Sequence, residues 1–102
     1  MEYKPTPPTP PPLYVYLGCW NDKGDNRGFK DTEKVKEEGA VEECYKAALL
    51  KGNTVFAVQA KKECWYGNDL AQAQSNGEAD ADMCPGGVGG GYKNALYIIS
   101  KS

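Results

Sequence analysis

The spacing of hydrophobic and polar positions changes several times along this chain, and each change predicts a different element. Residues 13–17, Leu-Tyr-Val-Tyr-Leu, alternate aromatic and aliphatic side chains, as expected for a β-strand with two unlike faces. Residues 21–28 are rich in Asn, Asp and Gly, which favour turns and are expected to end that strand. Residues 30–38 are highly charged and are interpreted as a surface loop or the approach to a helix.

A helical period begins at Ala40 and runs to Lys51. At about 100° per residue, the apolar side chains fall in one stripe roughly 120° wide. The stripe contains Ala40, Val41, Cys44, Ala47 and Ala48, with Tyr45 and Leu49 at its edge, and Glu42, Glu43 and Lys46 lie on the other side. Gly52 is suited to the left-handed conformation that ends many helices. The pattern predicts one amphipathic helix.

Three further apolar runs predict strands. Residues 54–59, Thr-Val-Phe-Ala-Val-Gln, hardly alternate, which indicates a strand buried on both faces. Residues 63–66 and 94–99 have strand length and composition. The order strand, helix, strand, strand, strand predicts an α+β domain in which one main helix covers a small antiparallel sheet.

Residues 67–93 are expected to be mostly irregular. Asp69 is placed to cap a short helix over residues 70–74, and residues 76–93 are interpreted as a loop. The glycine run at 86–91 lacks the GK[ST] ending and the preceding strand of a phosphate-binding loop. The glycines are better explained by tight turning and a close approach to a neighbouring backbone.

The first twelve residues differ from the rest, because they contain six of the seven prolines. Residues 4–12 are expected to form extended polyproline II, as a linker or arm before a domain at 13–102. Thr6 and Thr9 are candidate O-glycosylation sites in this arm. The arm is either a solvated spacer or a segment that docks on another copy or a partner, since such helices bind aromatic-lined grooves.

Composition removes several classes of function. A chain of 102 residues forms one domain, and the absence of histidine excludes histidine-based triads and mixed Cys/His zinc sites. A net charge of −2 argues against nucleic-acid binding. No apolar run approaches the roughly 20 residues of a membrane span, and no signal-peptide core follows Met1. The sequence therefore predicts a soluble, mature fragment.

Carboxylate pairs occur at Asp22/Asp25 and Asp80/Asp82. Paired acids are what a glycosidase requires, but these lie in short polar loops of a small domain. Solvated loop acids or a weak calcium site fit them better than catalysis. We therefore expect no catalytic residues, no required cofactor and no enzyme activity.

The four cysteines, Cys19, Cys44, Cys64 and Cys84, are 25, 20 and 20 residues apart. No close CxxC pair exists for a zinc ribbon or a redox site. Disulfides are favoured, and they indicate an extracellular location because they persist in oxidising compartments. The alternative is four buried thiols in a cytosolic domain.

Two segments place an aromatic ring directly after a cysteine and an amide and a carboxylate just beyond it. They supply two candidate carbohydrate-binding sets: Trp65, Tyr66, Asn68 and Asp69, and Trp20, Asn21 and Asp22. An indole can stack on the apolar face of a sugar while the polar groups satisfy its hydroxyls. The alternative is that the tryptophans pack on the disulfides; for Trp65 both interpretations stand, and for Trp20 packing is favoured.

The order of these motifs resembles the WSC domain. The resemblance covers residues 14–99 and rests on Gly-Cys-Trp-Asn-Asp at 18–22, Val-Glu-Glu-Cys at 41–44, Phe-Ala-Val-Gln at 56–59, Glu-Cys-Trp-Tyr-Gly-Asn at 63–68, Cys84 with the glycine run, and Leu96-Tyr97. The resemblance implies an extracellular domain built as a small sheet with a packed helix. It also implies carbohydrate binding, the role proposed for the family in cell-wall sensors and secreted enzymes.

This chain has fewer cysteines than the family pattern of eight. Ala48 and Tyr66 stand where two family cysteines pair with each other, and the two late cysteines that form another pair are also missing. The resemblance implies that the remaining bridges are Cys44–Cys64 and Cys19–Cys84. Such a reduced pattern is similar to WSC-like repeats of secreted and matrix proteins.

Two functional hypotheses follow. The first is a non-catalytic module of the cell wall or matrix that binds a glycan or cell-wall polysaccharide through the two sets named above. The second is a structural subunit of a matrix or filament, forming a homo-oligomer through residues 4–12, with an arm that carries O-linked sugars.

Overall fold

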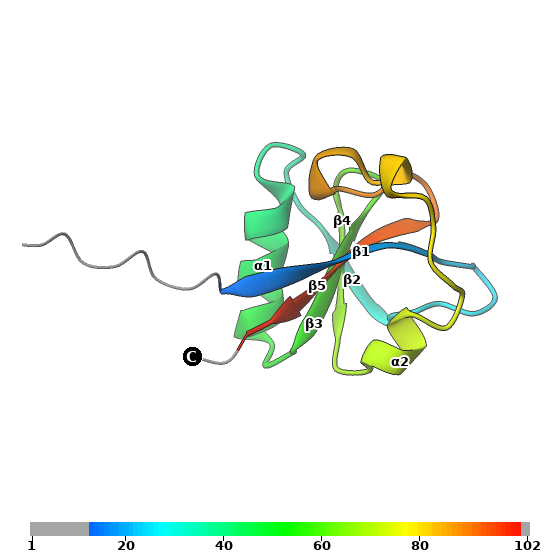
Figure 1. Cartoon of the computed structure of the whole chain (residues 1–102). Helices are drawn as coiled ribbons and strands as arrows, with labels where there is room; N and C mark the ends of the chain where they lie inside the picture. The colour runs from blue at the N-terminus through cyan, green and yellow to red at the C-terminus, as the bar shows by residue number, and fades with distance from the viewer. Residues whose placement is uncertain (1–12, 101–102) are drawn as a thin grey trace, which may run out of the picture.

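A computed structural model of the chain describes residues 13–100, so the proposed arm and Thr6 and Thr9 lie outside the described residues. The domain is a five-stranded antiparallel sheet with α1 on one face and α2 on the other (Figure 1). Its elements are β1 (Tyr14–Asn21), β2 (Asp31–Lys34), α1 (Ala40–Leu50), β3 (Val55–Gln59), β4 (Glu63–Gly67), α2 (Leu70–Ala73), the 3-10 turns η1 (Ala81–Met83) and η2 (Pro85–Gly87), and β5 (Lys93–Ile99). The predicted α+β architecture is confirmed.

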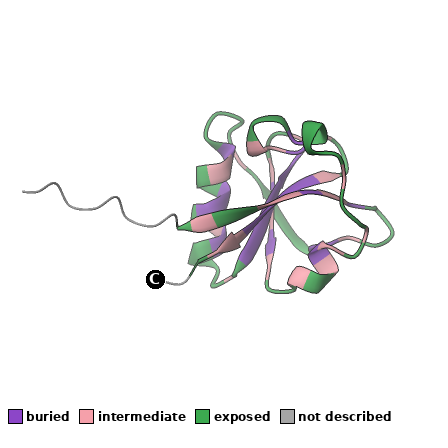
Figure 2. Ribbon diagram, viewed as in Figure 1, coloured by how far each residue is buried: buried purple, intermediate pink, exposed green. Residues whose placement is uncertain are grey.

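The strands lie in the order β1-β5-β3-β4-β2, so β3 and β5 occupy the centre and β1 and β2 the edges. All five residues of β3 are buried, which confirms the prediction from its unbroken apolar run. Phe56 and Val58 point towards α1, whereas Val55 and Ala57 belong to the cluster on the opposite face. Figure 2 shows the buried residues concentrated along the central strands and the inner side of α1.

Helix α1 forms where the helical period predicted it and packs against β3 and β4. Its buried positions are Ala40, Cys44, Tyr45 and Ala48. Gly52, with φ 74°, follows the helix in the left-handed conformation, and its N–H donates to Leu49 O at 3.0 Å. Small residues on the inner stripe allow the helix to lie close to the sheet.

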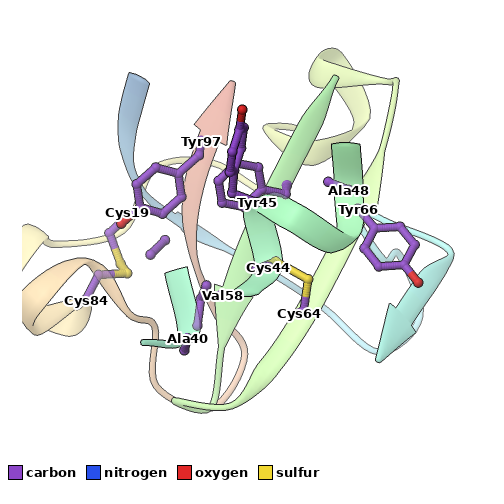
Figure 3. Close-up of a cluster of buried hydrophobic side chains, with 12 residues drawn as sticks. Cys19, Ala40, Cys44, Tyr45, Ala48, Val58, Cys64, Tyr66, Cys84 and Tyr97 are labelled. Carbon is purple, nitrogen blue, oxygen red and sulfur yellow. A yellow bond between two sulfur atoms is a disulfide. The ribbon is translucent and has the colours of Figure 1, made fainter. Parts of the chain in front are cut away.

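Both disulfides have the pairing that the family resemblance implied. Cys44–Cys64 joins α1 to β4, and Cys19–Cys84 joins β1 to the η1–η2 segment (Figure 3). All four half-cystines are buried. The bridges therefore pass through the core rather than over its surface.

An aromatic cluster fills the face of the sheet beneath α1, which we call the helix-covered face. Phe56 and Tyr97 stack at 5.0 Å between ring centroids, and Tyr14 meets both edge-on at 5.6 and 5.5 Å. Tyr45 from α1 lies 5.1 Å from Tyr14. Edge-on and stacked pairs of this kind stabilise a core beyond the apolar area they bury.

The opposite face is covered by residues 22–30 and α2, and we call it the loop-covered face. Its buried cluster consists of Phe29, Val55, Ala57, Ala73 and Leu96, with Leu17, Trp20, Trp65 and Leu70 partly buried around it. Asp69 caps α2 by accepting from Gln72 N at 3.0 Å, as predicted. The short helix thereby brings Leu70 and Ala73 onto the sheet.

Strand β2 is the main error of the sequence prediction, which placed residues 30–38 in a loop or the approach to a helix. Residues 31–34 instead pair with β4 along the sheet edge. All four side chains are exposed, so no buried face gives them a period-two pattern. Charged residues on an edge strand also discourage pairing with another sheet.

The glycine run behaves as predicted at Gly89. Its N–H donates to Val58 O at 2.9 Å, and a Cβ added there would lie 2.8 Å from that oxygen and collide with Lys93 O. Only glycine fits this approach of loop to strand. The loop is thus held against the end of β3.

Candidate functional site

The seven residues proposed for sugar binding do not form one surface. Trp20 and Trp65 border the loop-covered face, Tyr66 lies on the helix-covered face, and Asn68 and Asp69 form the turn between β4 and α2. Asn21 and Asp22 lie where β1 leads into the loop. Because adjacent residues of a strand point to opposite faces, a run of consecutive residues in β4 is divided between two sides.

Asp22 is buried at the centre of a polar network. Its Oδ2 accepts from Arg27 Nη1 at 2.6 Å and from Gln59 Nε2 at 2.9 Å, and its Oδ1 accepts from the Gly28 N–H at 2.9 Å. Gln59 Nε2 also donates to Asn94 Oδ1 at 2.8 Å. The carboxylate therefore fixes the loop 22–28 and the Arg27 side chain against the sheet.

Arg27 lies between two aromatic rings. Its Cζ is 4.5 Å from the centroid of the Trp65 ring and 5.1 Å from that of Tyr92. The Trp65 Nε1–H donates to Glu63 Oε1 at 3.3 Å. A sugar could stack on the outer face of Trp65 only after Arg27 moved, whereas Tyr92 is 52% exposed.

The two tryptophans do not pack on the disulfides. Both contact the cluster of the loop-covered face, while Cys44–Cys64 lies in the cluster of the helix-covered face. A residue directly after a half-cystine in a strand must face away from it, so that alternative was wrong in location. Packing itself, which was favoured for Trp20, is confirmed, and Trp20 Nε1–H donates to Leu17 O at 2.9 Å.

Tyr66 is buried rather than displayed. It lies towards β2 in Figure 3, and its hydroxyl donates to Glu33 Oε1 at 2.8 Å. Burial and this hydrogen bond raise the pKa of Tyr66 to about 12. Its ring belongs to the core, so it cannot serve as a stacking surface in this conformation.

Three polar residues of the predicted sets make local hydrogen bonds. Asn68 Oδ1 accepts from Thr54 N at 2.9 Å and from Thr54 Oγ1 at 3.1 Å, while Asp69 caps α2. Asn21 Nδ2 donates to Glu78 O at 3.4 Å. These side chains shape their surroundings whether or not they contact a ligand.

An open groove of about 910 Å³ lies beside Asn68 and Asp69 and is called the polar groove. Its walls are residues 25–31 and 66–70, together with Asn53 and Gln72. Gln72 Nε2 joins two other wall residues by donating to Asn26 Oδ1 at 3.1 Å and to Arg27 O at 2.9 Å. Amides, carboxylates and a lysine therefore line one continuous depression.

Most residues in the wall of the polar groove were not predicted from the sequence. Asn26, Asn53 and Gln72 are separated by 27 and 19 residues in the chain, and no local motif joins them. The described residues give no hydrogen-bond partner to the exposed side chains of Asp25 and Lys30. Both remain available to a ligand.

Metal binding gains no support from residues 13–100, where no three potential His, Cys, Asp or Glu ligands lie together. The same residues contain no helix with the length and hydropathy needed to cross a membrane.

Comparison with known proteins shows the family. The WSC domain matches residues 16–89, and the chain therefore belongs to the WSC domain family. It is 33% identical over 89 residues to the xylosyltransferase sqv-6 of Caenorhabditis briggsae. The aligned segment covers 81% of this chain and 11% of that enzyme. The chain thus spans a small part of the length of this relative, and the family predicted from the cysteine and aromatic motifs is confirmed.

Proposed function

We propose that this WSC domain is a non-catalytic, extracellular carbohydrate-binding module that holds its ligand in the polar groove. The observation that carries the proposal is the lining of that groove by amides and carboxylates from three separate segments. Sugar hydroxyls both donate and accept hydrogen bonds, and amide side chains match both roles. The volume lies within the range of small-molecule sites, about 300–1,000 Å³.

The proposed contacts retain Asn68 and Asp69 from the sequence-based set and add Asp25, Asn26 and Lys30. Asn68 and Asp69 are exposed at one wall. The Asp69 carboxylate keeps lone pairs that can accept from a ligand, whereas the Asn68 oxygen already accepts twice and its second Nδ2 hydrogen can donate. Tyr66 belongs to the wall of the groove but is buried, and Asp22 is buried outside the lining, where it holds Arg27 and Gly28 of the wall. Neither residue is assigned a sugar contact.

A binding role suits this groove better than catalysis. Glycoside cleavage requires an acid kept protonated in an apolar pocket, whereas the groove is open and its carboxylates are solvated. The two disulfides support an extracellular setting, because such bridges persist in oxidising compartments.

The test is a glycan array followed by calorimetry with the best oligosaccharide. Saturable binding by the wild type is expected, together with weaker binding by the double variant Asp25→Ala/Lys30→Ala. Lys36→Ala/Glu38→Ala is the matched control, since it removes the same charges from exposed positions outside the groove. Absence of saturable binding by the wild type would refute the proposal.

A second candidate, a structural subunit, is favoured by the start of edge strand β1. Leu13, Val15 and Tyr16 are 53%, 45% and 44% exposed, and they directly follow the proline-rich segment. An uncharged, apolar strand edge is suited to pairing with another chain. Sedimentation and electron microscopy should show assembly of the full chain that is lost on deletion of residues 1–11; unchanged behaviour would make the arm only a spacer.

A further inference from the structure

Tyr92 adopts a backbone conformation that an aromatic residue rarely takes. Its φ is 55°, and its side chain is 52% exposed. Bulky residues in the left-handed region are outliers that the surrounding structure must support. Three glycines, Gly89 to Gly91, precede it, yet this strained position carries a tyrosine.

The backbone of Tyr92 is held on both sides by buried polar residues. Its N–H donates to Gln59 Oε1 at 3.1 Å, and its carbonyl accepts from the Asp22 N–H at 3.0 Å. Gln59 and Asp22 are 2% and 5% exposed. The backbone of Tyr92, from which the ring projects, is therefore held in one position.

The Tyr92 ring is partly covered, and the side chain as a whole remains 52% exposed. Arg27 lies under it, and a Cβ added to Gly24 would be 3.8 Å from the ring. Arg27 is in turn held by Asp22 and by the Trp65 ring. Trp65, Arg27 and Tyr92 form a layered group, the Tyr92 stack, in which a large part of the outermost ring faces solvent.

We propose that the Tyr92 stack is a second saccharide subsite, in which the exposed face of Tyr92 packs on the C–H face of a neutral sugar ring. This inference rests on the proposed function. Residues 25–28 line the polar groove, and a Cβ added to the neighbouring Gly24 would lie 3.8 Å from the Tyr92 ring, so both subsites border one loop. A ring already held in position loses little conformational entropy when a ligand binds.

Charge favours a neutral ligand. Within residues 22–28 and the neighbouring Glu63 and Lys93, three positive groups are balanced by three negative groups: Lys23, Arg27 and Lys93 against Asp22, Asp25 and Glu63. Arg27 is already paired with Asp22. A uronate or sulfate would therefore meet no net positive charge.

The experiment compares four single variants with the wild type by calorimetry on neutral, uronate-containing and sulfated oligosaccharides. Tyr92→Asn and Tyr92→Gly remove the ring with residues that tolerate positive φ, and Tyr92→Phe keeps the ring. Tyr16→Thr is the control, because it removes the other exposed tyrosine of residues 13–100. Thermal midpoints are measured alongside.

We expect Tyr92→Asn and Tyr92→Gly to bind the neutral oligosaccharide about tenfold more weakly, with Tyr92→Phe and Tyr16→Thr close to the wild type. Unchanged affinity in both ring-deleting variants, with binding lost in Asp25→Ala/Lys30→Ala, would overturn the subsite and leave the proposed function standing. Tighter binding of the uronate or sulfated ligand would overturn the assigned ligand class. No glycan binding by the wild type would remove both proposals.

Discussion

The two faces of the sheet are built from different chemistry. On the helix-covered face, α1 is joined to β4 by Cys44–Cys64 and packs over an aromatic cluster. On the loop-covered face, a small apolar cluster is accompanied by a buried network in which Asp22 and Gln59 hold Arg27. Both faces are packed, but only on the loop-covered face do buried polar groups hold a surface loop in place.

This difference separates stability from recognition. A covalent bridge and apolar contacts resist unfolding without specifying what lies outside them. Buried hydrogen-bonded networks define the position of each member, since an unpaired buried group is costly. We infer that the helix-covered face supplies most of the stability, while the loop-covered face positions Arg27, Tyr92 and the polar groove.

Loss of the disulfides is expected to destabilise the domain most. In the chain-entropy model, the loops that Cys44–Cys64 and Cys19–Cys84 close contribute about 3 and about 4 kcal/mol, against a total of about 5–15 kcal/mol for a domain. Reduction is therefore expected to unfold the domain, as measured by near-UV circular dichroism.

Each bridge can be removed alone by Cys44→Ala/Cys64→Ala or Cys19→Ala/Cys84→Ala, with urea denaturation as the readout. Dichroism that stays native in excess reductant would contradict the expectation.

Alkaline pH should weaken the helix-covered face next. Burial raises the pKa of Tyr97 to about 12, and a hydrogen bond to Glu42, with burial, does the same for Tyr14. Tyr66 is similarly raised to about 12. Because these values exceed the ordinary pKa of about 10, the tyrosines stabilise the fold fully below pH 10 and lose that contribution as pH rises through 12.

A pH series of urea denaturation curves, with tyrosinate absorbance recorded in parallel, measures this. Tyr14→Phe should reduce the slope of stability against pH between 10 and 12. An unchanged slope in Tyr14→Phe would show that its hydroxyl does not contribute.

Truncating one ring on each face compares them directly. Phe56 is fully buried, so Phe56→Ala is expected to cost about 3–5 kcal/mol. Trp65 is partly exposed, and Trp65→Ala should cost about 1–3 kcal/mol while also lowering glycan affinity by freeing Arg27. Equal losses of stability in urea denaturation would contradict the division between the faces.

Asp22→Asn gives the smallest expected loss of stability. The variant keeps an acceptor for the Gly28 N–H, but its NH2 group replaces the oxygen that accepts from Arg27 and Gln59, and the charge that pairs with Arg27 is removed. The Arg27 side chain is 30% exposed and can regain water, so the cost should be about 1–2 kcal/mol. Arg27, which lies against the Tyr92 ring, should lose its fixed position, and sugar affinity should fall more than the thermal midpoint suggests. Affinity equal to the wild type would show that the network does not contribute to binding.

Strong local periodicity made several elements predictable. The apolar stripe of α1, the unbroken run of β3 and the capping carboxylate of Asp69 are each visible within a few residues, and the structure confirms them. The bridge pairing was not predictable from spacing, and it came from the family resemblance. Strand β2 was missed because an exposed, charged strand has no buried face to mark it.

The chain's own order of residues therefore determined the fold class, the main helix, the central strands and the capacity to form two bridges, because these depend on short-range periodicity and on residue type. Which side chains meet depends on how the elements pack together. Consecutive residues of β4 point to opposite faces because of strand geometry. A buried network places Arg27 against Trp65 and Tyr92, which come from separate segments of the chain. Contacts of that kind depend on the packing of whole faces, which no local pattern encodes.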